Sequence, residues 1–156
     1  MASNSITKAP ISDGWHGSQT RVKILPKDFV ANDDAARMGI VVEDAIAGNG
    51  HGITVESSNL EMYAYVLVPQ GYKATGLKVA GTEASNRIYS WEACSVGCTL
   101  TALIDEGLGD PARYVGTEYA FDTEMVSGLT NYVLIKVMTT GTADIIYGGY
   151  VIIERV

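Results

Sequence analysis

The side chains of this chain best suited to bind a metal ion are those of two histidines and two cysteines. Cys94 and Cys98 form a C-x3-C pair, whereas His16 and His51 stand far apart and each precedes a glycine in an expected loop. Zinc sites usually take their ligands from closely spaced pairs of cysteines and histidines. Because the histidines form no such pair, the spacing predicts that the protein holds no metal ion.

The segment between the two cysteines is better explained as a turn. Ser95, Val96 and Gly97 fit a three-residue hairpin loop in which Gly97 adopts the left-handed conformation. Cys94 and Cys98 would then lie opposite each other, where oxidation could join them. A short loop gains little stability from such a bond, so we expect two reduced thiols in a cytoplasmic protein, with the disulfide as the alternative.

The carboxylates and glycines form no recognised site either. The segment 105–111, DEGLGDP, has the oxygen atoms and turns of a calcium loop but lacks its D-x-[DN]-x-[DN]-G order, so a solvated loop is expected. The same holds for Asp33 and Asp34. The segment 48–52, GNGHG, is followed by Ile53 and a strand pattern, which favours a hairpin turn over a dinucleotide loop.

The chain contains no G-x-S-x-G, P-loop or H-E-x-x-H motif. We therefore expect a protein that is not an enzyme and that needs no cofactor. Its aromatic residues leave a binding role open, because Tyr63 and Tyr65, and likewise Tyr89 and Trp91, alternate along strand patterns and share a face. Each pair could stack on a sugar, but the core is the more common place for such residues and is the favoured interpretation.

These residues must be positioned by strands, because helical periodicity is almost absent. Residues 1–18 have neither period and are expected to form an extended N-terminal arm, whereas 19–156 are expected to form one domain. A single short helix is predicted at 32–39. The remaining pattern predicts an all-β fold, a jelly-roll-like β-sandwich. Its expected strands lie at 20–25, 39–45, 52–57, 61–69, 75–81, 86–94, 98–105, 115–122, 131–139 and 143–156.

The last two strands are apolar at both odd and even positions, which is typical of strands covered on both faces. We predict that they pair as a central hairpin, with a bulge at Gly148 and Gly149. The same pattern predicts that the buried strand residues include Tyr132, Leu134, Val151 and Ile153.

Composition restricts the partners. The formal net charge is −7, and the 11 lysines and arginines are scattered, so neither nucleic acid nor an anionic membrane is an expected partner. Only 19% of the residues are charged, compared with roughly 25% in typical soluble proteins. The low charge content predicts that part of the surface is covered in a homo-oligomer.

The stretches VPQGYKATGLKVAG and TNYVLIKVMTTGTADIIYGGYVIIERV resemble small all-β structural proteins of marine tailed bacteriophages. The resemblance covers about 62–156 and carries over no active residue. It implies a virion protein made in the host cytoplasm and located on the capsid surface, a decoration or cement protein that bridges neighbouring subunits of the major capsid protein. The resemblance also implies that the homo-oligomer is a trimer. The arm would contribute anchors at Ile6, Ile11 and Trp15. A glycan- or receptor-binding β-sandwich of a head or tail fibre is the alternative.

Overall fold

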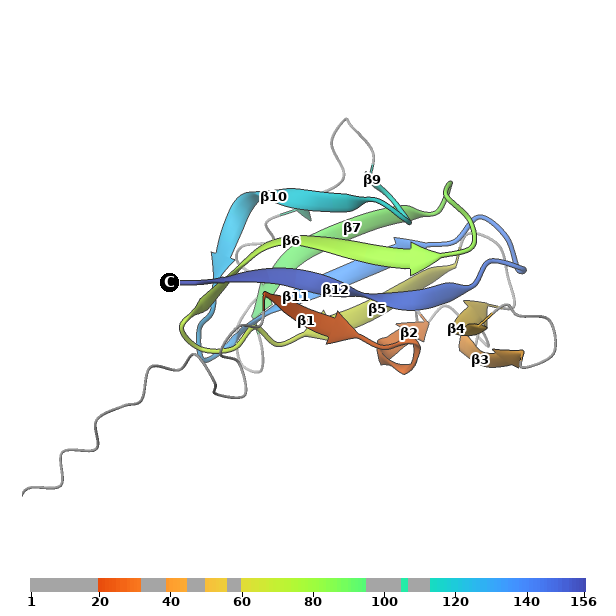
Figure 1. The fold of residues 1–156 in the computed structure, drawn as a ribbon, viewed down its shortest axis with the longest axis horizontal. Helices are drawn as coiled ribbons and strands as arrows, with labels where there is room; N and C mark the ends of the chain where they lie inside the picture. Colours follow the sequence, from red (N-terminus) through yellow and green to blue (C-terminus); the bar gives the residue numbers. More distant parts are fainter. Residues whose placement is uncertain (1–19, 32–38, 45–49, 56–59, 95–104, 107–112) are drawn as a thin grey trace, which may run out of the picture.

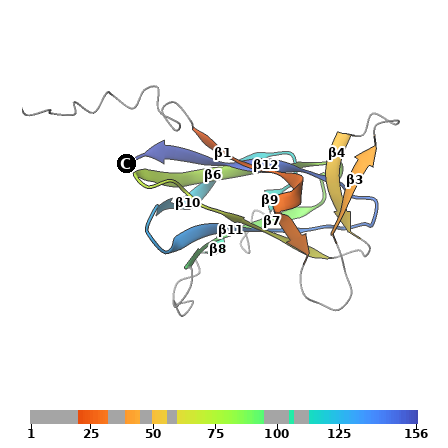
Figure 2. The same cartoon turned by 90° about the horizontal axis from the view of Figure 1, so that it is seen from below.

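The protein is a β-sandwich in a computed structural model that describes residues 20–31, 39–44, 50–55, 60–94, 105–106 and 113–156. Two antiparallel sheets of six strands pack face to face (Figures 1 and 2). The strands are β1 (Arg21–Ile24), β2 (Phe29–Ala31), β3 (Gly39–Asp44), β4 (Gly50–Val55), β5 (Glu61–Val66), β6 (Tyr72–Gly81), β7 (Arg87–Cys94), β8 (Asp105–Glu106), β9 (Arg113–Tyr114), β10 (Glu118–Val126), β11 (Asn131–Met138) and β12 (Ile146–Arg155). A short 3-10 helix, η1 (Pro26–Asp28), joins β1 to β2.

Sheet A has the order β10-β6-β12-β4-β3, with β1 also paired to β12. Sheet B has the order β2-β5-β11-β7-β8, with β9 also paired to β7. From β5 to β7, and again from β10 to β12, successive long strands alternate between the two sheets. This connectivity confirms the predicted jelly-roll-like sandwich. None of the helices in the described part of the chain is long and apolar enough to cross a membrane.

The core forms where the inner faces of the sheets meet. Strand residues alternate between the two sides of a sheet, so one parity of each central strand is buried. In β11 the odd-numbered residues Val133, Ile135 and Val137 are buried, and in β12 Val151 and Ile153 are buried. Both residues predicted to be buried in the last strand therefore lie in the core.

A bulge in β12 confirms the prediction at the paired glycines. The register of β12 with β6 shifts between Ile146 and Gly148, and Gly148 has a φ of 107°. A Cβ atom added to Gly148 would collide with the backbone oxygen of Ile24. Ile146 pairs with β4, whereas Gly149 pairs with Ile24 of β1. The bulge thus marks the point at which β12 exchanges one neighbour for another.

The predicted C-terminal hairpin is wrong, because β11 and β12 belong to different sheets. The connection between them is held by side chains that carry the chain from one sheet to the other. The Asp144 carboxylate accepts hydrogen bonds from the backbone N–H groups of Thr140 and Gly141 at 3.0 and 2.7 Å. Thr140 also donates its N–H to the side-chain oxygen of Asn86 at 2.9 Å. Each strand is nevertheless central, as predicted, but in its own sheet.

The burial predicted for Tyr132 and Leu134 is also wrong. Both are half-buried on the outer face of sheet B, because the even-numbered residues of β11 point away from the core. Two further predictions lie largely outside the described residues. Of the helix predicted at 32–39, only Gly39 is described, and it begins β3. The hairpin loop predicted after Cys94 is not among the described residues. Of the turn predicted at 48–50 only Gly50 is described, and it begins β4, where it pairs with Asp44 of β3.

Candidate binding surface

The outer face of sheet B collects tyrosines from three neighbouring strands. The register of β11 places Leu134 between Tyr65 of β5 and Trp91 of β7, and Lys136 between Tyr63 and Tyr89. Because paired residues of adjacent strands point to the same side of a sheet, the outward side chains form one continuous surface. We call this surface the tyrosine face and define it by Tyr63, Tyr65, Tyr89, Tyr132, Leu134 and Lys136.

Tyr65 is the most exposed tyrosine of the tyrosine face, with 57% of the residue's surface exposed. Its ring centroid lies 5.6 Å from that of Tyr132, and the two planes are inclined at 62°. Such edge-to-face pairs are stabilising beyond the area that they bury. The pair therefore presents two rings to solvent in a fixed relative orientation.

A hydrogen-bonded cluster adjoins the rings. The Glu61 carboxylate accepts hydrogen bonds from the Tyr63 hydroxyl at 2.7 Å and from the Lys136 ammonium at 3.0 Å. Lys136 also lies over the ring of Tyr89, with its Nζ atom 4.6 Å from the centroid. Lys136 is thereby held between the Glu61 carboxylate and the π face of Tyr89.

The environment of Glu61 favours its ionised form. Partial burial acts to raise the pKa of this carboxyl. The hydrogen bonds from Tyr63 and Lys136, together with the positive charge of Lys136, outweigh burial and hold the pKa below its ordinary value. At neutral pH the cluster thus presents a carboxylate, a phenol and an ammonium group in fixed positions beside exposed rings.

The outer face of sheet A is polar instead. Arg21 lies 4.5 Å from the ring centre of Tyr150 and forms an ion pair of 3.5 Å with Glu118, which also accepts a hydrogen bond from the Tyr150 hydroxyl. That hydrogen bond is the main cause of a raised pKa at Tyr150. Lys73 pairs with Glu124 at 2.6 Å. The charges on this face are arranged in small networks that partly satisfy one another.

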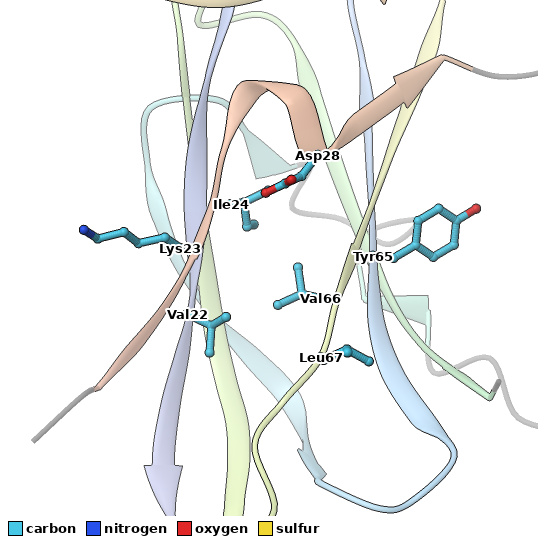
Figure 3. Close-up of a pocket in the computed structure, with 7 residues that line it drawn as sticks. All are labelled: Val22, Lys23, Ile24, Asp28, Tyr65, Val66 and Leu67. Atoms are coloured by element: carbon cyan, nitrogen blue, oxygen red, sulfur yellow. The ribbon is translucent and has the colours of Figure 1, made fainter. Parts of the chain in front are cut away.

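A groove lies at the side of the sandwich, between β1 of sheet A and the end of β5 in sheet B. Its volume is about 280 Å³. Figure 3 shows Val22, Ile24 and Val66 pointing into the groove, whereas Lys23 and Tyr65 point outward from its two walls. Asp28 lies at one end, where its carboxylate accepts the backbone N–H of Leu25 at 2.8 Å.

The residues singled out in the sequence lie partly on the strands and partly outside the described residues. Tyr63 and Tyr65 lie on the outer face of sheet B, so the core interpretation is wrong for them, and Tyr89 is covered although it belongs to the same face. His51 is exposed in strand β4, not in a loop. The described residues contain no group of three or more potential metal ligands. Outside the described residues lie Ile6, Ile11, Trp15, His16 and Cys98.

Two features were missed by the sequence reasoning. Glu61 and Lys136 are 75 positions apart, so nothing local indicates that they meet. The alternation of Glu61, Tyr63 and Tyr65 was a usable signal, because a carboxylate on the same face as the tyrosines indicates solvent and not core. The groove depends on where β2 stops pairing with β5, and no pattern in the sequence marks that point.

No family model matches the sequence, and no curated protein matches it. Among solved structures, the chain is similar to the CBM22-1 and GH10 modules of xylanase 10B from Clostridium thermocellum, crystallised with xylohexaose, at a TM-score of 0.44 and 15% identity. The match covers 85% of this chain and 27% of that one, so this chain corresponds to about a quarter of the larger protein. The likeness is one of fold.

Proposed function

We propose that the protein is a glycan-binding β-sandwich, without catalytic activity, that recognises a saccharide chain through the tyrosine face. The observation that carries the proposal is the exposed Tyr65 and Tyr132 ring pair beside the cluster of Glu61, Tyr63 and Lys136. Aromatic rings bury the apolar C–H faces of sugars, and fixed carboxylate and ammonium groups bond their hydroxyls. Both kinds of group lie side by side on the outer face of sheet B, with the rings more exposed than the half-buried charged cluster.

The shape of the surface restricts the ligand. Small-molecule sites are usually concave and enclose most of the ligand, whereas the tyrosine face is the outside of a sheet. Because the two rings are inclined at 62°, they form a corner and not a flat platform. This geometry suits a flexible chain of several sugars, such as a receptor glycan, better than a single sugar or the flat surface of a crystalline polymer.

The test measures binding on a glycan array, followed by titration calorimetry with the best oligosaccharide. Replacing Tyr65 or Tyr132 by alanine is expected to weaken binding at least tenfold, because each removes one ring from the pair. Tyr150→Ala, on the opposite sheet, is the matched control and is expected to bind like the unchanged protein. Binding that survives both sheet B substitutions, or the absence of any glycan ligand, would contradict the proposal.

Capsid decoration is the second candidate, and apolar exposure supports it. Leu67 and Val30 are 76% and 59% exposed at the edge of sheet B, where contact with a neighbouring subunit would cover them. In this role the protein would be a homotrimer bound to the major capsid protein. A variant that combines Ile6→Ser, Ile11→Ser and Trp15→Ser is then expected to attach less well to purified phage heads. The variant Tyr65→Ala is expected to attach like the unchanged protein. Attachment that needs Tyr65 and not the arm would favour the glycan proposal.

A further inference from the structure

The groove beside β1 has two walls made of strand edges. Within the part of the chain that the structure describes, β1 pairs only with β12. The opposite wall is the end of β5, where β2 pairs with Ala64 but not with Tyr65 or Val66. Unpaired strand edges present backbone N–H and C=O groups that can add a further strand. The groove is therefore open to an extended segment.

The two sides of β1 differ in chemistry. Val22 and Ile24 point into the groove, and Val66 faces them from β5 (Figure 3). Arg21 and Lys23 alternate with them and are exposed on the outer face of sheet A. Side chains of an added strand would continue these two rows, because paired residues of adjacent strands share a face. Apolar residues would enter the groove, and the residues between them would meet two cations.

From this arrangement we propose that β1 accepts an extended peptide in which apolar and acidic residues alternate. The carboxylates of the peptide would lie beside Arg21 and Lys23, and its aliphatic side chains beside Val22, Ile24 and Val66. Lys23 forms no ion pair within the described residues, so its charge is available. The proposal concerns the side of the sandwich and does not depend on the tyrosine face.

Charge decides against two other occupants. Two copies of β1 placed edge to edge would bring the Arg21 and Lys23 rows of both chains together, and like charges opposed across strands are destabilising. The arm at 1–18 has a single acidic residue, Asp13, so it lacks the alternation. The whole protein carries a net charge of −7 and repels an acidic peptide in general. Binding must therefore come mainly from Lys23, with a smaller part from Arg21, whose charge is shared with Glu118.

The test uses fluorescence anisotropy with the full chain and a labelled, end-blocked octapeptide of alternating valine and glutamate. We expect saturable binding that weakens with added salt, and weaker binding of the matching valine and lysine octapeptide. In a second peptide, the backbone nitrogens that would face β1, at alternate residues, are methylated. This peptide is expected not to bind, because those nitrogens could no longer donate hydrogen bonds to β1. Equal binding of the methylated peptide would overturn strand addition.

Two variants of equal charge locate the contact. Lys23→Glu is expected to weaken binding about fivefold to tenfold, because it replaces an attraction with a repulsion at the edge. Lys78→Glu changes the same face two strands further in, since both lysines pair with Tyr150, and is expected to change the affinity less than twofold. Equal losses in both variants would overturn the proposal in favour of general charge attraction.

A third variant addresses the arm. If the arm occupied the edge, Ile11→Asp would release the groove and increase the affinity for the octapeptide. We expect this variant to bind the octapeptide as the unchanged protein does. A clear gain would show that the arm is the occupant and would overturn the proposal, as would the absence of any binding by the full chain.

Discussion

On the outer face of sheet A, Glu118 is bonded to Arg21 and Tyr150, and the side chains of Arg21 and Glu118 are exposed. On the outer face of sheet B, Glu61 is bonded to Lys136 and Tyr63 within a half-buried cluster among tyrosines. The same three residue types, a carboxylate, a cation and a tyrosine, thus occur on both faces. Burial makes the difference, because a covered ion pair depends on its partners more than an exposed one.

Strand β1 places Arg21 on the outer face of sheet A, and β1 pairs with β12 beside the bulge at Gly148. Gly148→Val is expected to lower the free energy of unfolding by about 3 kcal/mol, because valine rarely adopts the positive φ at this bulge. Its Cβ atom would also collide with the backbone oxygen of Ile24. Urea denaturation measures the loss. The same substitution at Gly71, which also has a positive φ but has nothing within 4 Å of its Cβ position, is the control and is expected to cost less.

The two carboxylates can be compared directly by removing their charges. Glu61→Gln is expected to destabilise the protein by about 1 to 2 kcal/mol, because Lys136 would keep its charge with a weaker partner in a partly buried position. Glu118→Gln is expected to cost less than about 1 kcal/mol, as exposed ion pairs do. Urea denaturation of both variants gives the comparison. Equal losses would show that burial does not distinguish the two faces.

Both faces should also respond to pH, in opposite directions. The pKa of Glu61 is lowered in the folded protein, so its contribution is present above the ordinary value of about 4.5 and is lost as the pH falls through the lowered value. The pKa of Tyr150 is raised, so its contribution is present below about 10 and is lost as the pH rises through the raised value. Thermal unfolding should therefore depend less on acid in Glu61→Gln, and less on alkali in Tyr150→Phe, than in the unchanged protein.

The overall fold could be predicted from the sequence, whereas the orientation of several side chains could not. Alternation and turn residues were enough for the sandwich, for the bulge at Gly148 and for the buried Val151 and Ile153. They failed for Tyr132 and Leu134, because an apolar residue looks the same in a sequence whether a second sheet or solvent covers it. Local pattern shows that a residue faces one side of a strand, and only the pairing of strands shows which side is the core.

The false hairpin has a related physical cause. Two apolar strands joined by a short polar segment normally pair with each other. Here the segment is fixed by Asn86, which lies 54 positions from Thr140 in the chain and bonds to its N–H. The ion pair of the tyrosine face, between Glu61 and Lys136, depends in the same way on residues 75 positions apart. Such contacts follow from the finished topology and leave no local signal.

Leu67 directly follows β5 of sheet B and contrasts with the buried leucines of the core. Leu67→Ser should change the free energy of unfolding by less than about 0.5 kcal/mol, because a side chain that is already 76% exposed loses little on truncation. Leu77→Ser, on the inner face of sheet A, is the contrasting variant, because this side chain is fully buried and its loss leaves a cavity and a buried hydroxyl. Urea denaturation compares the two.

If Leu67→Ser were as costly as a core substitution, then the leucine would be covered in the folded protein, by another copy or by a part of the chain that is not described. A neutral result combined with loss of binding to a glycan or a phage head would instead assign Leu67 to recognition, since its exposure would then serve the partner and not the fold.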